Sequence, residues 1–562
     1  MPSSDGLRQA PDRASPMTEK PPAAGMALNS YDAMPYPATA QTESHPDRLA
    51  TLATLMGLTP PPVDHCRVLE LGCSDGGNLL SLAYGLPGSE FVGVDYSARE
   101  VAAGQDHIAE LGLKNITLHH LDITEASPEL GLFDYILACG VFSWVPLLVQ
   151  ERMLELCHQL LTPQGVAYVN YNTYPGWFMR APVRGMLLYH TRGIADPKER
   201  AAEARAMLGF VADAAQIAQE RYAASAGKRK AYVAALRHEQ GVVGDHPDTY
   251  LLHEHLEEQN QALYFHEFVE RAGQHGLQYL ADAEYTLTPL HLQIPEVTQK
   301  LGQFGNDPVR LEQYLDFITN RSFRQTLLCH QGLALRRNFS PEQMAGFWVA
   351  SPVLPESGKP DLHSTAPERF RNAHGTKLTA SHPVAKAALM HLSEIWPQAL
   401  PFEALLEVAR RRLEPETMPI YSAERLAHEA QGVGEMLLSG FWVDMVELHV
   451  CPPRYQTQIG ERPEASLLAR HQARSRRHVM NLRHEALTID DEITYRLLPW
   501  VDGQHDRSAL VDRLLGLVQA GTLVAQAENG RPYGECANVE ALLVAAVDKA
   551  LRRLADAALL VA

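Results

Sequence analysis

Between residues 67 and 172, short apolar segments alternate regularly with longer amphipathic ones, and this alternation constrains the fold more than any other feature. The apolar segments have the length of β-strands, and the segments between them repeat apolar residues at helical spacing. Strands that alternate with helices build a parallel sheet with helices on both faces. The predicted strands are RVLEL, EFVGVDYS, NITLHHLD, FDYILACGV and GVAYVNYN, and the predicted helices are GGNLLSLAYGL, AREVAAGQDHIAELGL and PLLVQERMLELCHQLL.

After Trp177 the alternation stops, and residues 178 to about 250 are polar and helical. Strand signals return in YFHEFVERAGQHGLQYLADAEY, which predicts a helix, a glycine turn and a strand, and in RQTLLCHQG, which predicts another strand. We interpret these two strands as the last of the same sheet. The fold class is then α/β, with a seven-stranded Rossmann-like sheet interrupted by a helical insertion.

Length and composition indicate how the rest of the chain is divided into domains. At roughly 150 residues per domain, 562 residues predict three or four domains. A Pro-rich polar stretch reads as a linker, and the order helix–helix–helix–strand that follows it suggests a winged helix. The predicted parts are a disordered leader (1–28), a ligand-binding core (29–180), a helical insertion with the last strands (181–335), a linker (352–380), a winged-helix-like domain (381–455) and a small helical or winged C-terminal domain (465–562).

Charge and hydropathy exclude some classes of protein. The formal net charge is -18, from 67 acidic and 49 basic residues. A dedicated nucleic-acid-binding protein shows a basic face, so we expect no nucleic-acid partner. No stretch approaches the roughly 18 apolar residues of a membrane helix, and residues 1–25 lack the apolar core of a signal peptide. We therefore expect a cytoplasmic protein without a membrane span.

Metal sites are also not expected. The seven cysteines are scattered and form no CxxC pair, which argues against a disulfide framework or a cysteine zinc site. The triplet His253-Glu254-His255 invites a metal site, but its two histidines face different ways on a helix, and HExxH spacing is absent. We interpret the triplet as part of a helix and leave open that Glu254 reaches the active site.

A glycine-rich loop joins the first strand of the alternation to its first helix. Small residues let a ligand approach the backbone, and the helix N-terminus offers free N–H groups. Dinucleotide sites need GxGxxG, whereas the glycines here fall at 72, 76 and 77. The pattern ExGxxxGG, which starts at Glu70, is closer to the loop of S-adenosylmethionine enzymes, where a carboxylate and the loop backbone meet the amino-acid end of the cofactor.

Two acids follow the next two strands. Asp95 ends EFVGVDYS, where it can accept both ribose hydroxyls, and Asp122 follows LHHLD, where it can accept the adenine amino group. Loop, acids and strand order together resemble the class I S-adenosylmethionine-dependent methyltransferases, although Ser74 stands where many of them have glycine. The resemblance implies S-adenosyl-L-methionine as cofactor. It implies as binding residues Glu70, Gly72, Cys73, Ser74, Gly76, Asn78, Asp95, Tyr96, Asp122, Ile123 and Cys139.

Other segments of the sequence resemble a smaller group within these methyltransferases. They are SYDAMPYPATAQTESHPDRLATLA before the alternation, YVNYNTYPGWFMR at its end, and YLLHEHLEEQNQALYFHEFVERAGQHGLQYLADAE after the insertion. The combination is similar to bacterial methyltransferases with a methyltransferase regulatory domain, which include rickettsial protein-lysine methyltransferases with a C-terminal winged-helix region. The resemblance implies methyl transfer, and implies lysine as the acceptor only for some members.

An acceptor pocket is expected at the end of the fifth strand. Methyl transfer from a sulfonium is an in-line displacement, so the enzyme mainly positions the acceptor. An amine acceptor must be neutral, so the pocket needs a proton acceptor or a water path, and aromatic or polar groups that orient the nitrogen. Ser143 and Trp144 are also placed for this role. The predicted catalytic residues are Tyr31 and Tyr36, which would form a lid over the cofactor, and Tyr171, Asn172, Tyr174 and Trp177.

Three activities remain open at this point: a methyltransferase acting on protein lysine, a small-molecule methyltransferase, and a non-catalytic S-adenosylmethionine-binding regulator. The large insertion and the extra C-terminal domains favour a macromolecular acceptor, because small-acceptor enzymes of this fold usually consist of one compact domain. We therefore predict an enzyme with a protein substrate, and leave open whether it forms a homodimer. The domain scheme also predicts that a chain without residues 381–562 still binds the cofactor.

Overall fold

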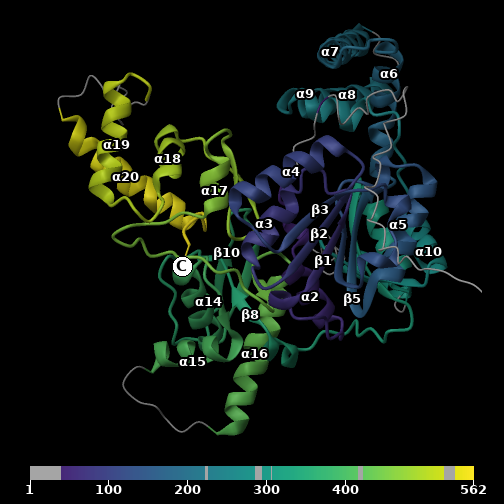
Figure 1. Cartoon of the computed structure of the whole chain (residues 1–562). Coiled ribbons are helices and arrows are strands. Elements are labelled where there is room, and N and C mark those ends of the chain that lie inside the picture. Colours follow the sequence, from purple (N-terminus) through teal and green to yellow (C-terminus); the bar gives the residue numbers. More distant parts are fainter. Residues whose placement is uncertain are drawn as a thin grey trace, which may run out of the picture.

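The computed structural model describes residue 34 and residues 39–221, 226–284, 294–304, 307–414, 422–523 and 538–561. The predicted leader (1–28) and the two lid tyrosines, Tyr31 and Tyr36, lie outside these residues. Figure 1 shows a central sheet with helices on both sides, a group of helices that projects from it, and two smaller units beside it.

A seven-stranded mixed sheet forms the centre of the fold (Figure 1). Its order is β3-β2-β1-β4-β5-β7-β6. The strands are β1 (Arg67–Leu71), β2 (Glu90–Asp95), β3 (Ile116–His120), β4 (Phe133–Ala138), β5 (Leu161–Asn172), β6 (Leu277–Asp282) and β7 (Phe323–His330). The two late strands belong to the sheet as predicted. The expectation of a parallel sheet is wrong at β7, which runs antiparallel to both β5 and β6, because hydrophobic period identifies a strand without its direction.

Helices cover both faces of the sheet. Those on one face are α2 (Pro46–Leu55), α3 (Gly77–Gly85) and α4 (Ala98–Leu111), and those on the other are α5 (Leu147–Leu160) and α10 (Phe265–Gln274). Successive side chains of β1 point to opposite faces of the sheet. Val68 packs in the hydrophobic cluster that contains α2 and α3, whereas Leu69 and Leu71 pack in the cluster that contains α5. The alternation in the sequence therefore corresponds to two hydrophobic layers.

The insertion between β5 and β6 is helical, as predicted. It contains α6 (Ala181–His190), α7 (Pro197–Arg221), α8 (Ala226–Asp245), α9 (Asp248–Tyr250) and the π-helical turn η8 (Leu251–His255). Leu208, Leu236 and Leu251 belong to its own hydrophobic cluster. A second helical segment, α12 (Pro295–Leu301) and α13 (Pro308–Thr319), connects β6 to β7. Short 3-10 turns in the sheet domain include η1 (Thr42–Ser44), η2 (Val63–His65), η3 (Ile123–Glu125), η4 (Pro128–Leu130), η5 (Phe142–Trp144), η6 (Gly176–Met179) and η10 (Gly302–Phe304).

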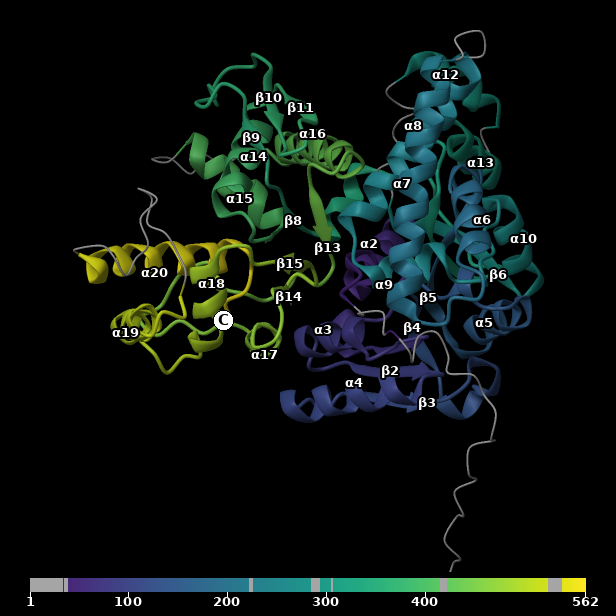
Figure 2. The same ribbon diagram turned by 90° about the horizontal axis from the view of Figure 1, so that it is seen from above.

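A middle unit, residues 341–449, lies beside α2 (Figure 2). It contains η11 (Pro341–Gly346), β8 (Trp348–Ala350), α14 (Pro383–Ile395), β12 (Leu400–Pro401), α15 (Phe402–Leu413), α16 (Ala423–Phe441) and β13 (Glu447–His449). β8 lies between β12 and β13 in a three-stranded sheet. The middle unit thus takes its first strand from the sequence before the predicted linker.

The predicted linker is itself structured. Residues 352–380 contain β9 (Leu354–Pro355), β10 (Glu368–Arg371) and β11 (Lys377–Ala380), which form a second small sheet in the order β11-β10-β9. Phe370 of β10 is fully buried. The three strands are very short and mostly polar, so they carry no hydrophobic period that would have distinguished them from a linker.

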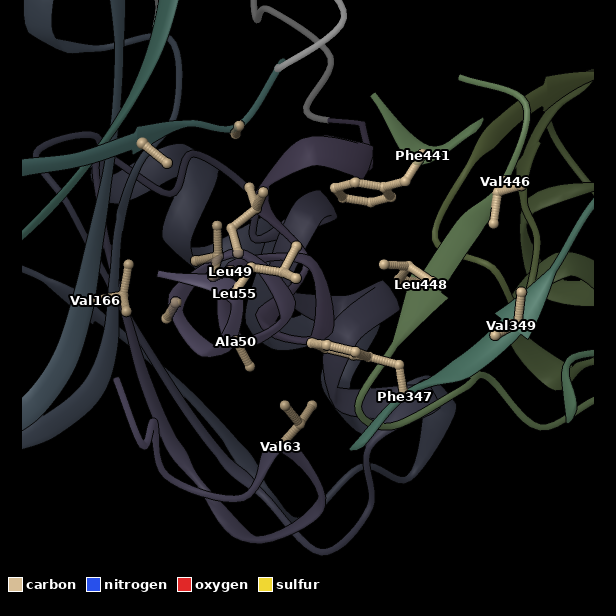
Figure 3. Packing of buried hydrophobic residues seen from close by; sticks show 14 of the residues in the cluster. Leu49, Ala50, Leu55, Val63, Val166, Phe347, Val349, Phe441, Val446 and Leu448 are labelled. Atoms are coloured by element: carbon tan, nitrogen blue, oxygen red, sulfur yellow. The ribbon is translucent and has the colours of Figure 1, made fainter. Parts of the chain in front are cut away.

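Helix α2 joins the sheet domain to the middle unit. Leu49 and Leu55 of α2 lie between Val166 of β5 and the side chains of Phe347 and Leu448 in the middle unit (Figure 3). Each of these five residues is at most 5% exposed. One hydrophobic cluster therefore runs from the sheet through α2 into the middle unit, and the two parts do not have separate cores.

The C-terminal unit has a core of its own. It contains α17 (Leu467–Gln472), β14 (His478–Met480), β15 (Ala486–Thr488), α18 (Glu492–Leu497), η12 (Leu498–Trp500), α19 (Arg507–Gln519) and α20 (Val539–Asp556). Figure 2 shows the β14–β15 hairpin between the C-terminal helices and α3. Within the described part of the chain, no helix is both long and apolar enough to cross a membrane.

Candidate functional site

The glycine-rich loop between β1 and α3 takes its shape from three left-handed residues. Gly72 (φ 76°) and Gly76 (φ 73°) adopt backbone conformations that glycine takes without strain. The N–H groups of Gly72 and Cys73 both bond to the carbonyl of Val94, at 2.9 and 3.1 Å, which fixes the loop against β2. Ser74 is also left-handed (φ 52°), so serine keeps the local conformation that a glycine would take there.

Asp95, at the end of β2, connects this loop to the start of α4. Its Oδ2 accepts the backbone N–H of Ser74 at 2.8 Å, and its Oδ1 accepts that of Ser97 at 2.8 Å. Both bonds hold the carboxylate at the edge of the sheet, directly below the glycine-rich loop. The position and the charge of Asp95 therefore suit the hydroxyl groups of a ligand.

Asp122 lies at the same edge of the sheet, one strand further out. The N–H of Leu121 bonds to the carbonyl of Asp95 at 2.9 Å, which holds the two strand ends together. The Asp122 carboxylate accepts the backbone N–H and the hydroxyl of Thr124, at 2.8 and 2.7 Å. Tyr96 is 49% exposed beside them, whereas Ile123 is buried in the hydrophobic layer below. The predicted nucleoside residues thus come together along one edge.

Glu70, the last but one residue of β1, is a buried carboxyl group at the base of the loop. It is 2% exposed, and its Oε1 accepts the side-chain amide of Asn78 at 3.0 Å. Its Oε2 has no hydrogen-bond partner among the described residues. Burial raises the pKa of the Glu70 carboxyl to about 8, and the bond from Asn78 offsets only part of that effect. A cation placed at Oε2 would satisfy the carboxylate.

Two cysteines flank Glu70. Cys73 is 3% exposed, and its sulfur packs so closely on Gly93 that an added Cβ there would lie 2.6 Å away. Cys139 follows β4, and its sulfur lies 3.8 Å from the Asn78 amide nitrogen. Burial raises the pKa of both thiols, so they remain protonated. Cys73 therefore shapes the loop and offers a ligand no reactive side chain.

The end of β5 contributes an asparagine that sequence reasoning missed. Asn170 Oδ1 accepts the N–H of Gly140 at 2.6 Å and thereby holds the turn after β4. Gly140 is left-handed (φ 67°), and an added Cβ would meet no described atom within 4 Å, so the space beside it is open. The segment Asn170-Tyr171-Asn172 places its two asparagines on one face of the strand, and this alternation could have identified Asn170.

Tyr171 points to the opposite face of β5, into the hydrophobic core. It is 1% exposed, its ring stacks on Phe268 with centroids 4.1 Å apart, and its hydroxyl lies 3.1 Å from the hydroxyl of Thr326. The period of two along a strand places Tyr171 away from both neighbouring asparagines. We therefore remove Tyr171 from the predicted acceptor pocket.

Asn172 and Trp177 lie where the insertion begins. The Asn172 backbone donates to the Ser143 hydroxyl at 2.9 Å, while its buried Nδ2 has no hydrogen-bond partner among the described residues. A buried amide N–H without a partner destabilises the folded protein by about 1–3 kcal/mol. A hydrogen bond to a ligand oxygen would remove this destabilisation. Trp177 meets Trp144 at a centroid distance of 6.2 Å, and the Arg180 guanidinium lies 5.4 Å from the Trp177 ring.

Tyr174 belongs to a partly exposed aromatic group. Its ring stacks on Phe178 with centroids 4.0 Å apart and lies 5.3 Å from the ring of Tyr264. Phe178 is 50% exposed. Tyr174 is thus placed as predicted at the end of β5, on the side that faces solvent rather than the core.

Polar contacts join the helices of the insertion to one another and to Met34, which lies before the sheet domain. Arg184 donates to the carbonyls of Glu254 and Glu257, at 2.6 and 2.7 Å. His255 Nε2 lies 3.0 Å from Glu239, and His253 Nε2 lies 2.7 Å from the carbonyl of Met34. The histidines of the triplet thus bind within the fold. No group of three or more His, Cys, Asp or Glu within the described ranges is arranged to hold a metal ion.

Three family models match the chain. One described as "Methyltransferase domain" matches residues 69–167, and one described as "Predicted methyltransferase regulatory domain" matches residues 247–330. A third, described as "PKMT, C-terminal winged helix domain", matches residues 461–559. This last match assigns a winged helix to the C-terminal segment, for which the sequence left helical and winged alternatives open.

Relatives and solved structures agree with these matches over most of the chain. An uncharacterized protein of Rickettsia prowazekii is 35% identical over 509 residues, which cover 89% of this chain and 88% of that protein. A second protein of that organism is 36% identical over 243 residues, or 43% of this chain and 93% of that protein. The structure of PKMT2 from Rickettsia typhi is 28% identical, covers 94% of this chain and 100% of its own, and superposes with a TM-score of 0.81. PKMT2 has also been solved in complex with AdoHcy.

Proposed function

The chain belongs to the family of class I S-adenosylmethionine-dependent methyltransferases that carry a regulatory domain and a PKMT C-terminal winged helix domain, and we propose that it methylates lysine side chains of a protein. Methyl transfer from S-adenosylmethionine is the activity of the family. The likeness to PKMT2 over 94% of the chain, together with the match to the PKMT C-terminal winged helix domain, is the observation that carries the lysine proposal.

The residues around the loop fit the proposed cofactor. The unsatisfied Oε2 of Glu70 suits the ammonium group at its amino-acid end, and the carboxylate of Asp95 suits the ribose hydroxyls. Asp122, on the neighbouring strand end, suits the adenine amino group. When bound, S-adenosylmethionine supplies a methyl group activated by its sulfonium. The proposed binding residues remain those predicted from the sequence, with the backbone of Gly72, Cys73 and Ser74 lining the loop.

The acceptor is proposed to lie at the carboxyl ends of β4 and β5. Asn172 offers a buried amide donor without a partner among the described residues, and Tyr174 and Trp177 offer aromatic faces in the segment that follows β5. Aromatic faces attract a lysine ammonium and orient its alkyl chain. This chain would thus position the acceptor nitrogen and exclude water, which is the main demand of an in-line displacement. The lid role of Tyr31 and Tyr36 remains a sequence-based prediction.

The test is incubation of the full chain with S-adenosylmethionine labelled on its methyl group and a bacterial lysate. We expect label in protein bands, and mass spectrometry of those bands should place the added methyl groups on lysine. The variant Asp95→Asn should lose this labelling, whereas Asp106→Asn, in which the exposed acid of α4 is altered, should keep it. Label found only in small molecules would contradict the lysine proposal, and tight binding without any turnover would indicate a regulator.

A further inference from the structure

The tip of the β14–β15 hairpin lies against the helix that follows the cofactor loop. Residues 481–485 form this turn, and Asn481 Oδ1 accepts the backbone N–H groups of Arg483 and Glu485 at 2.9 and 2.8 Å. His484 stands at the turn with a left-handed backbone (φ 59°). It is only 3% exposed, because the turn packs on α3 in the sheet domain (Figure 2).

Both ring nitrogens of His484 bind side chains of α3. Nε2 lies 2.9 Å from Asn78 Oδ1, and Nδ1 lies 2.9 Å from the Ser81 hydroxyl. The Asn78 amide nitrogen donates to Glu70, so its oxygen must accept, and the tautomer of His484 with hydrogen on Nε2 satisfies it. Burial, and next the nearby His45, lower the pKa of His484 well below its usual range, so the ring is neutral.

Asn78 connects His484 to the cofactor site. Its oxygen accepts from His484 and from the backbone N–H of Gln41, at 2.9 Å each. Its nitrogen donates to Glu70 Oε1 at 3.0 Å and to the Ser44 hydroxyl at 3.2 Å. These four bonds, to three separate segments of the chain, hold the amide in one orientation. The oxygen of Glu70 that is left over is the one without a partner in the described structure.

We propose that the C-terminal winged-helix unit completes the cofactor site, with His484 as a positioning residue that orients Asn78 and, through it, the Glu70 carboxyl group. The inference rests on the proposed cofactor site, since it assigns Glu70 to the amino-acid end of S-adenosylmethionine. In this proposal His484 acts on the site through its bond to Asn78. The hairpin thereby makes cofactor binding depend on a domain that lies outside the methyltransferase fold.

Other contacts keep the C-terminal unit docked when His484 is changed. The N–H of Leu467 donates to the Tyr84 hydroxyl at 2.9 Å, and His471 lies 3.3 Å from Glu110. Arg483 donates to Glu447 of the middle unit at 2.8 Å. A single substitution at His484 therefore tests the link to Asn78 without releasing the whole unit.

The test is calorimetric titration of S-adenosylhomocysteine into the full chain. His484→Leu should bind about tenfold more weakly than the wild type, as expected for one lost buried hydrogen bond that leaves its partner unpaired. His484→Gln, whose amide nitrogen can reach the position of Nε2, should restore affinity to within about threefold. His478→Leu is the matched control, because His478 is an exposed histidine of the same hairpin that contacts Thr488.

A second readout separates positioning from general destabilisation. The bond from Asn78 lowers the pKa of Glu70, so its loss should raise the pH at which cofactor affinity reaches half of its limiting value. If His484→Leu fails to fold, the same titration of His484→Asn tests the inference, because the shorter amide of asparagine cannot reach Asn78. Wild-type affinity and an unchanged pH midpoint in folded His484→Leu or His484→Asn would overturn the inference. No binding by the wild type would instead refute the proposed cofactor site.

Discussion

Glu70 should make cofactor binding depend on pH. Burial raises the pKa of its carboxyl to about 8, so the group is mostly protonated at pH 7 in the free protein. Pairing with an ammonium group requires the carboxylate, so binding should release a proton. We expect affinity for S-adenosylhomocysteine to rise up to tenfold per pH unit below about 8 and to level off above it.

Calorimetry in buffers of different ionisation enthalpy measures the released proton directly. The control is Glu70→Gln, which keeps the size of the side chain and cannot ionise. Its affinity should be weaker and independent of pH in this range. A wild-type affinity that is equally flat between pH 6 and pH 8 would show that Glu70 does not pair with the cofactor.

Asp95 is the second residue whose replacement should weaken binding. Asp95→Asn keeps one oxygen for the loop but removes the charge that strengthens bonds to the ribose hydroxyls. Hydrogen bonds to a charged group are worth about 1.5–3 kcal/mol, so the dissociation constant should increase at least about tenfold. Fluorescence or calorimetric titration measures it. Asp106→Asn, in the exposed face of α4, should bind as the wild type does; equal affinity in both variants would refute the assignment of Asp95.

At the scale of single elements, α2 is the helix that packs on both the sheet and the middle unit. Its side chain Leu49 is fully buried between the sheet and the middle unit (Figure 3). Leu49→Ala should lower the free energy of unfolding by about 2–5 kcal/mol, because the cavity cannot collapse between two packed units. Denaturant unfolding measures the change. The control Leu148→Ala alters a residue of α5 that is 75% exposed, and should change stability by less than about 0.5 kcal/mol; similar losses in both variants would contradict the role of α2.

The prediction of elements from the sequence succeeded where the hydrophobic period was long. The five strands of the alternation, the helices between them and the two late strands all lie near their predicted positions. It failed in residues 352–380, where β9 to β11 are too short and too polar to show a period. The direction of β7 was also not accessible, because a strand has the same period in either direction.

At the scale of the whole molecule, a charged junction joins α2 to the middle unit. His449 Nδ1 lies 2.7 Å from Asp47 Oδ2, and its Nε2 lies 3.4 Å from Glu447. Burial alone would lower the pKa of His449, but the two carboxylates outweigh it and raise the pKa to about 9. Protonated His449 should therefore stabilise the folded chain fully below its usual value of 6.5, and this contribution should be lost as pH rises through about 9.

The measurement is the thermal unfolding midpoint between pH 6.5 and pH 9.5. The wild type should lose stability across this interval, whereas His449→Gln should start lower and change less. His478→Gln, an exposed histidine of β14, serves as the control and should follow the wild type. Parallel curves for the wild type and His449→Gln would show that the junction does not depend on this proton.

The contacts between the units argue against the predicted effect of a truncation. The domain scheme predicted that a chain without residues 381–562 would still bind the cofactor. In the structure, that deletion would remove Phe441 and Leu448 from the cluster around α2, and His484 from Asn78. We now expect such a chain to bind the cofactor more weakly or not to fold, because the core and the site are completed by distant segments.

The sequence by itself determined the α/β fold, the cofactor loop and the acids that follow the next two strands. These features are local: glycine spacing sets a turn, and the end of each strand places Asp95 and Asp122 at one edge. The tertiary structure alone decided that Tyr171 enters the core, that α2 is shared by two units, and that His484 reaches Asn78 across 406 positions of the chain. Such contacts depend on how separate units pack, and no local pattern in the sequence records which buried partner a side chain will meet.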